Sequence, residues 1–97
     1  MMQYVNTKNE IAVFVAPPHY QWLKTKVIAA EFEKAFQSGC TKVMVDFTNT
    51  KTIDSSSIGQ LCSIRNKVKP ENFSVIHPTG KVLQELRSSN LTSWIKE

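Results

Sequence analysis

The sequence predicts a single α/β domain over residues 1–97, with a mixed four- to five-stranded sheet and about four helices packed on it. Three observations predict this class. The chain has 97 residues, enough for one small core. Its composition, 41% hydrophobic and 21% charged, is typical of a folded domain. Apolar strands alternate with segments of helical periodicity, which indicates right-handed crossovers and a mostly parallel sheet, made mixed by an opening hairpin.

The hairpin is predicted from two short apolar runs, Gln3–Asn6 and Glu10–Val15, around the polar turn Asn6–Asn9. Ile11–Val15 is continuously apolar, which favours a strand buried on both faces. Pro17 and Pro18 end this strand.

A helix is predicted from Tyr20 to Gln37, closed by Gly39 as its left-handed cap. Its wide apolar stripe consists of Trp22, Leu23, Val27, Ile28, Ala30, Phe32, Ala35 and Phe36. We expect both Trp22 and Trp94 to pack in the core or at its edge rather than to anchor an interface.

The second half continues as strand, helix, strand, helix and a final short helix, over Val43–Phe47, Ser55–Val68, Phe73–Ile76, Lys81–Ser88 and Leu91–Ile95. Pro70 ends the Ser55–Val68 helix, because the residue before a proline disfavours helical angles.

The chain is expected in the cytoplasm. It contains no apolar run of about 18 residues that could span a membrane. Its start, Met1–Lys8, lacks the apolar core and cleavage site of a signal peptide. Cys40 and Cys62 have no metal-ligand spacing and are expected to be free thiols.

The net charge of +4 raises the question of nucleic-acid binding. The basic residues are scattered along the chain and are not clustered with aromatic residues, as a groove that follows a nucleic-acid backbone would require. We therefore expect no direct nucleic-acid partner.

The segment Ile53–Gly59 holds the strongest functional signal. It places Asp54, Ser55, Ser56 and Ser57 at the entrance of a predicted helix, where backbone N–H groups have no partner within the helix. A phosphate there would meet free donors and a favourable dipole, so the segment predicts a phosphorylation switch. The alternative is that Ser55 or Ser56 only caps the helix. Asp54 is expected both to cap the helix and to face a partner.

The order of elements, together with Val43–Phe47 followed by Thr52–Leu61, resembles the STAS domain of bacterial anti-sigma factor antagonists. The resemblance covers about Tyr4 to Ile95. It implies a partner switch: the unphosphorylated antagonist binds an anti-sigma factor that is also a GHKL-type serine kinase. Phosphorylation then releases it, and a PP2C-type phosphatase resets the cycle.

Carried onto this chain, the resemblance implies that Ser56 is the phosphoacceptor, with no cofactor or metal. The partner-binding residues it implies surround Ser56: Pro17, Pro18, His19, Lys51, Thr52, Asp54, Ser55, Ser57, Ile58 and Gly59. Ser57 stands where the family usually has glycine, which leaves open which serine is modified. The turn Ala16–Tyr20 also replaces the family's common acidic turn, which leaves the partner's identity open.

Two other function classes remain. A STAS subunit could instead regulate a membrane transporter or an ABC lipid or solute transport complex, without a phosphoswitch. A small enzyme is disfavoured, because Asp54–Ile58 lacks both glycines of the Gly-x-Ser-x-Gly elbow. No spacing indicates a histidine oriented by an acid either.

Overall fold

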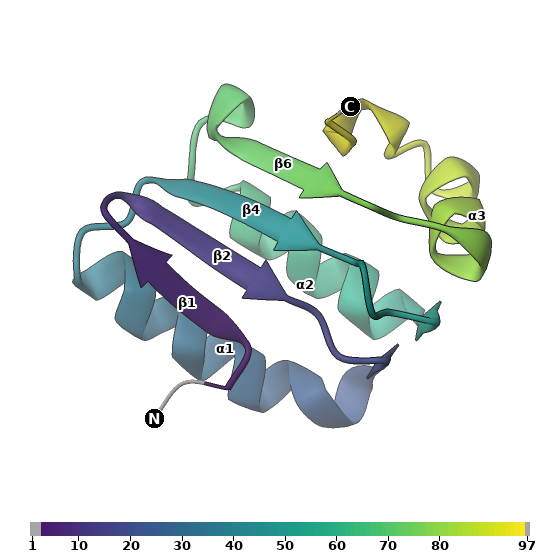
Figure 1. The fold of residues 1–97 in the computed structure, drawn as a ribbon, viewed down its shortest axis with the longest axis horizontal. Coiled ribbons are helices and arrows are strands. Elements are labelled where there is room, and N and C mark those ends of the chain that lie inside the picture. The colour runs from purple at the N-terminus through teal and green to yellow at the C-terminus, as the bar shows by residue number, and fades with distance from the viewer. Residues whose placement is uncertain (1–2, 97) are drawn as a thin grey trace.

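A four-stranded mixed sheet forms the centre of the computed structural model, which describes residues 3–96 (Figure 1). The strand order is β1-β2-β4-β6. β1 (Val5–Lys8) runs antiparallel to β2 (Ile11–Val15), and β4 (Lys42–Asp46) and β6 (Phe73–Ile76) continue the sheet in parallel. The predicted mixed α/β sheet is thus confirmed, with four strands.

The α-helices are α1 (Trp22–Gln37), α2 (Ser55–Arg65) and α3 (Gly80–Ser88). Two 3₁₀ turns follow Lys69 and Leu91: η1 (Pro70–Asn72) and η2 (Thr92–Trp94). The predicted final helix is therefore a single 3₁₀ turn. A further pair of very short parallel strands, β3 (His19–Tyr20) and β5 (Thr52–Ile53), lies outside the main sheet.

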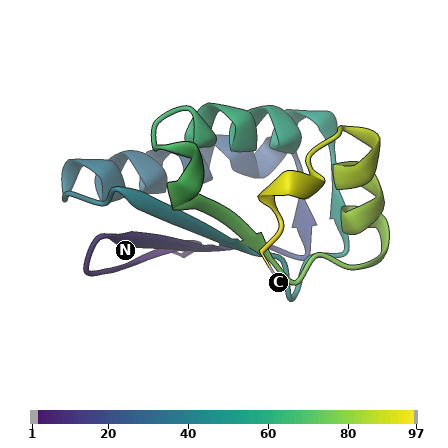
Figure 2. The same cartoon turned by 90° about the horizontal axis from the view of Figure 1, so that it is seen from above.

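α1 and α2 lie side by side on one face of the sheet, and in the described residues no helix covers the other face (Figure 2). The prediction that β2 is buried on both faces is wrong for this reason. Ala12 and Phe14 are 0% exposed, whereas Ile11, Val13 and Val15 are only half-buried. The continuous apolar run of β2 therefore has one covered face and one partly open face.

The hairpin turn lies later than predicted. Lys8 pairs with Ile11, so the turn residues are Asn9 and Glu10, and Asn6–Lys8 belongs to β1. Asn9 has φ 57°, a left-handed conformation that asparagine tolerates better than most residues. Part of the Met1–Lys8 segment, Met1 and Met2, lies outside the described residues.

The first turn of α1 differs from the prediction. Tyr20 belongs to β3, and the helix begins at Trp22. Trp22 is 62% exposed, so the expectation that it packs in the core or at its edge is wrong, and Leu23 of the predicted apolar stripe is 68% exposed. Trp94, by contrast, is buried and stacks edge-on against Phe73, as predicted. The error arises because α1 has apolar residues on two sides and the sheet covers only one.

α2 ends at Arg65, before the predicted Val68. Its tail tightens into 3₁₀-type bonds, from Lys67 N–H to the Ile64 carbonyl and from Val68 N–H to the Arg65 carbonyl. Further along, Lys96 N–H donates to the Val75 carbonyl at 2.8 Å, so the C-terminal segment lies along β6. No helix within residues 3–96 has the length and apolar content needed to cross a bilayer.

Candidate functional site

Asp54 organises the end of the molecule at which α1 and α2 begin. It is the residue before α2, in an extended conformation, and its carboxylate caps that helix. Asp54 Oδ1 accepts from the backbone N–H of Ser57 at 2.9 Å and from the Ser57 hydroxyl at 2.9 Å. The predicted capping role of Asp54 is confirmed, and the alternative in which Ser55 or Ser56 caps the helix is wrong.

The same carboxylate also serves α1. Asp54 Oδ2 accepts the backbone N–H of Trp22 at 3.0 Å, although Gln21, the N-cap of α1, makes no side-chain cap of its own. Burial raises the pKa of Asp54, but the bonds from Ser57 and Trp22 outweigh it, and the net pKa lies below the ordinary value. One ionised side chain therefore holds two helix N-termini at the same place.

The three serines of the motif are in different environments. Ser57 is completely buried, and its hydroxyl donates to the Tyr20 carbonyl at 2.5 Å as well as contacting Asp54. Ser55 and Ser56 are exposed in the first turn of α2. An enzyme approaching from solvent therefore reaches Ser55 or Ser56 without unfolding the helix, whereas Ser57 is inaccessible in the folded chain.

Tyr20 connects the site to both helices. Its ring is fully buried against Phe14 in an edge-on contact, and its hydroxyl donates to Gln60 Oε1 of α2. Gln60 Nε2 in turn donates to the Thr25 carbonyl of α1 at 2.6 Å. Burial, and secondarily the charge of Asp54, raises the pKa of Tyr20, so the phenol stays protonated as a donor. This network keeps the starts of α1 and α2 in fixed positions.

Two loops predicted to contact a partner meet at this site. The backbone N–H groups of Lys51 and Thr52 both donate to the Pro18 carbonyl, at 2.7 and 3.2 Å. His19 Nδ1 and Thr52 Oγ1 lie 2.9 Å apart. The pairing of β3 with β5 thus joins the segment after β2 to the segment before α2.

The residues of the predicted partner-binding set differ in exposure. Pro18, His19, Lys51, Ser55 and Gly59 are exposed, and Thr52, Asp54 and Ile58 are half-buried. Pro17 and Ser57 are buried and support the surface from below. All belong to the short strands β3 and β5, to the turns before them, or to the N-terminal half of α2 with its cap Asp54.

Sequence reasoning missed the contribution of α1 to this site. The bond between Trp22 N–H and Asp54 joins residues 32 apart in the chain, and no local pattern indicates it. α1 contains more apolar residues than one buried stripe needs, and this excess is a signal that could have indicated its exposed first turn. Within residues 3–96 no cluster of three or more His, Cys, Asp or Glu side chains could hold a metal ion.

No protein-family model matches the sequence, and a search of curated proteins finds no match. Solved structures do match. The anti-sigma factor antagonist SpoIIAA in its unphosphorylated form is 18% identical with a TM-score of 0.81, over 95% of this chain and 84% of that chain. The Bacillus cell fate determinant SpoIIAA in the phosphorylated form is 18% identical with a TM-score of 0.73, over 95% of this chain and 86% of that chain.

A third structure, a candidate anti-sigma factor antagonist from Thermotoga maritima, is 18% identical with a TM-score of 0.78, over 95% of this chain and 81% of that chain. At such low identity the likeness establishes the fold, and the STAS-like fold expected from the motif is confirmed. What those proteins do is a separate question, which depends on the residues of the site.

Proposed function

We propose that this protein is an anti-sigma factor antagonist that acts by partner switching. In its unphosphorylated form it binds an anti-sigma factor that is also a GHKL-type serine kinase. Phosphorylation of Ser56 releases it, and a PP2C-type phosphatase restores the binding form. The protein acts as a binding module without catalysis or cofactor, in the cytoplasm, where a kinase has ATP.

One observation carries this proposal: Ser56 is exposed in the first turn of α2, while the neighbouring Ser57 is buried and bonded to Tyr20 and Asp54. This contrast favours Ser56 over Ser57, the serine that stands in place of the family's usual glycine. A protein of the same fold is known in phosphorylated and unphosphorylated forms, which supports a phosphoswitch in this fold.

The partner surface that we propose surrounds Ser56. It consists of the exposed and half-buried members of the predicted set: Pro18, His19, Lys51, Thr52, Asp54, Ser55, Ile58 and Gly59. Because β3 pairs with β5, residues from both loops form one surface with the start of α2. A partner that contacts this surface would cover the Ser56 hydroxyl.

Phosphate on Ser56 would release the partner through its charge. A phosphoserine carries about −1.5 to −2 charges at neutral pH. In the free protein it would lie in water at the positive end of α2, at little cost. Pressed against a partner without matching cations, it would lose that water, and the desolvation costs several kcal/mol, on the order of 3 to 5.

The test is incubation with each GHKL-type serine kinase encoded beside or near this chain's gene, with ATP, followed by mass-spectrometric mapping of the phosphate. We expect modification at Ser56. Ser56→Ala should keep binding and lose release, and Ser56→Asp should bind more weakly, since one carboxylate carries less charge than a phosphate.

Ser63→Ala is the matched control, because Ser63 is also an exposed serine of α2, two turns further on. It should be phosphorylated and released like the wild type. Phosphate at Ser57, or no phosphate with a kinase that binds the chain, would refute the assignment of Ser56.

A further inference from the structure

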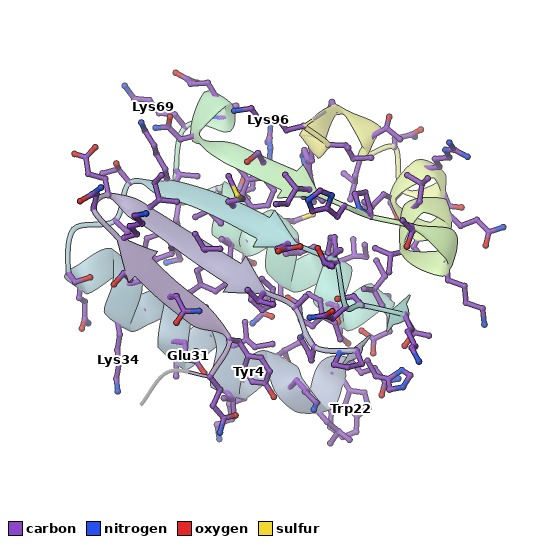
Figure 3. The ribbon with its side chains drawn as sticks, in the orientation of Figure 1. Tyr4, Trp22, Glu31, Lys34, Lys69 and Lys96 are labelled. Carbon is purple, nitrogen blue, oxygen red and sulfur yellow. The ribbon has the colours of Figure 1, made fainter. Side chains whose placement is uncertain are left out.

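The exposed apolar residues of α1 form a surface that the fold itself does not use. Trp22, Leu23 and Val27 are 62%, 68% and 50% exposed, and they are the large hydrophobic residues that lie exposed within residues 3–96. We call these residues the α1 patch. They occupy the first two turns of one helix, and Trp22 points away from the body of the molecule (Figure 3).

The α1 patch is separate from the apolar side of α1 that packs on the sheet. Ile28, Phe32 and Ala35 are buried there, at 0%, 2% and 0% exposure. Leu23 and Val27 are four residues apart and share a second side of the helix that is open to water, and Trp22 precedes them at the start of the same helix. Adjacent exposed side chains of this size are typical of an interaction site, whereas single exposed ones need no explanation.

The residues around the α1 patch are basic. Lys24 and Lys26 alternate with the patch along the chain, and the first turn of α1 contains no acidic residue. Lys51 is exposed in the loop before β5, and its backbone N–H donates to the Pro18 carbonyl. The ionised Asp54 carboxylate nearby offsets only part of the positive charge of these lysines. The positive charge of the lysines complements a partner surface that carries carboxylates.

The α1 patch begins beside Asp54, which belongs to the Ser56 surface. Trp22 N–H lies 3.0 Å from Asp54 Oδ2, and Asp54 precedes Ser55 and Ser56. Gln60 of α2 bonds to Thr25, which lies between Leu23 and Val27. The two surfaces are therefore held in a fixed relation before any partner arrives, which lowers the entropy cost of binding.

We propose that the α1 patch is the apolar anchor of the surface that surrounds Ser56, and that the kinase partner meets it with an apolar pocket bordered by carboxylates. This inference rests on the proposed function and adds the chemistry of the partner. A phosphate at Ser56 then brings negative charge toward the carboxylates of the partner, in addition to its desolvation.

A protein partner fits the surface better than a membrane or a second copy. Gly59 is exposed in the middle of α2, and a Cβ added there would meet no atom within 4 Å, so the fold itself does not require glycine. A side-chain-free position of this kind permits close approach of another protein backbone, which a lipid surface does not need. Two copies of this basic surface would repel each other.

The experiment measures binding of the kinase that modifies Ser56 to wild-type chain, to the double variant Leu23→Ser with Val27→Ser, and to Lys26→Glu. We expect the double variant to bind at least about tenfold more weakly. Lys26→Glu should slow association and reduce its dependence on salt. Both changes lie at exposed positions, so the thermal midpoint should stay near that of the wild type.

Lys69→Glu is the matched control, since Lys69 is an exposed lysine at the opposite end of the molecule from Trp22 (Figure 3). It should bind like the wild type. If the double variant also binds like the wild type, the inference is wrong and the proposed function is unaffected. If no kinase binds the wild-type chain, both are wrong.

Two further measurements test the other occupants. In the first, the wild-type chain is mixed with vesicles of neutral lipid containing an anionic lipid, and its binding to them is measured. In the second, sedimentation of the wild-type chain alone gives its mass and so detects a dimer. Vesicle binding that is lost in the double variant, or a dimer that the double variant abolishes, would overturn the inference in favour of a membrane or a second copy. We expect no vesicle binding and a monomer.

Discussion

At the scale of single residues, Asp54 links stability to function. Its two oxygens accept from the starts of two helices, and Ser56, two residues later, is the proposed switch. A carboxylate that is bonded in this way favours its charged form, which explains the lowered pKa. The position of Ser56 therefore depends on the Asp54 carboxylate, whose charge changes with pH.

We predict that Asp54→Asn weakens the pH dependence of stability. The folded-state pKa of Asp54 is lowered, so its contribution is present above the unfolded-state pKa and is lost as pH falls through the folded-state pKa. Thermal midpoints between about pH 7 and about pH 2 measure this effect. The wild type should lose stability on acidification more steeply than the variant, which is less stable by roughly 1 kcal/mol at neutral pH.

Ser55→Ala is the comparison, because Ser55 is the next residue, is exposed and carries no titratable group. It should leave the acid limb of the stability curve close to that of the wild type. Identical acid limbs for Asp54→Asn and the wild type would contradict the role given to Asp54.

A second residue-scale prediction concerns Gly59. It lies inside α2 at an ordinary helical φ with open space around its Cα, so Gly59→Ala should stabilise the protein by about 0.5 to 1 kcal/mol. Chemical denaturation measures the gain. Gly39→Ala should do the opposite, since Gly39 has φ 103°. A loss of stability in Gly59→Ala would show that the glycine serves the fold rather than a partner.

At the scale of elements, Glu31 joins α1 to the edge strand. It is 6% exposed, and its Oε1 accepts the backbone N–H groups of Tyr4 and Val5, both at 2.8 Å. Burial raises the pKa of Glu31, but the bonds from Val5 and Tyr4 outweigh it and lower the net pKa. The start of β1 is thus fastened by a side chain as well as by its pairing with β2.

We predict that Glu31→Ala loosens β1 selectively. Removing the carboxylate leaves the two N–H groups without their acceptor, at a cost of roughly 2 to 3 kcal/mol. Hydrogen exchange should speed up in β1 and change less in β6. Glu33→Ala is the control on the same helix, because Glu33 is exposed. Equal acceleration in β1 and β6 would indicate global unfolding rather than a local fastening.

The elements show where sequence reasoning succeeds and where it fails. Hydrophobic period predicts α1 and α3, whereas the prediction of α2 also depends on the polar residues Asp54–Ser57 at its entrance and on Pro70 beyond its end. The two-residue strands β3 and β5 were missed, since they are too short to show a period. The turn at Asn9 was misplaced because polar residues continue into β1.

At the scale of the whole molecule, one fact explains the larger errors: α1 and α2 lie on one face of the sheet (Figure 2). β2 and the first turns of α1 contain more apolar residues than the one interface between these helices and the sheet covers. Local pattern cannot say which apolar side meets the sheet, because that depends on the packing of distant elements. The motif Asp54–Gly59 was identified from sequence, but the bond from Asp54 to Trp22 depends on the tertiary fold.

The same scale supports a final prediction, that phosphorylation of Ser56 acts locally. Ser56 is exposed, so a phosphate adds no buried charge to the free protein, and the start of α2 offers a favourable dipole worth about 0.3 to 1 kcal/mol. The sheet and the Tyr20–Gln60–Thr25 network need not rearrange. Backbone amide spectra of the two forms should therefore differ around Ser56 and the start of α1, and the thermal midpoint should be unchanged or slightly raised.

The chain phosphorylated at Ser56 by the kinase is compared with the unmodified chain and with Ser56→Ala treated in the same way. Shifts that spread through β2, β4 and β6, or a midpoint lower by many degrees, would mean that the switch works through a second conformation of the domain instead of through charge at the surface of the partner.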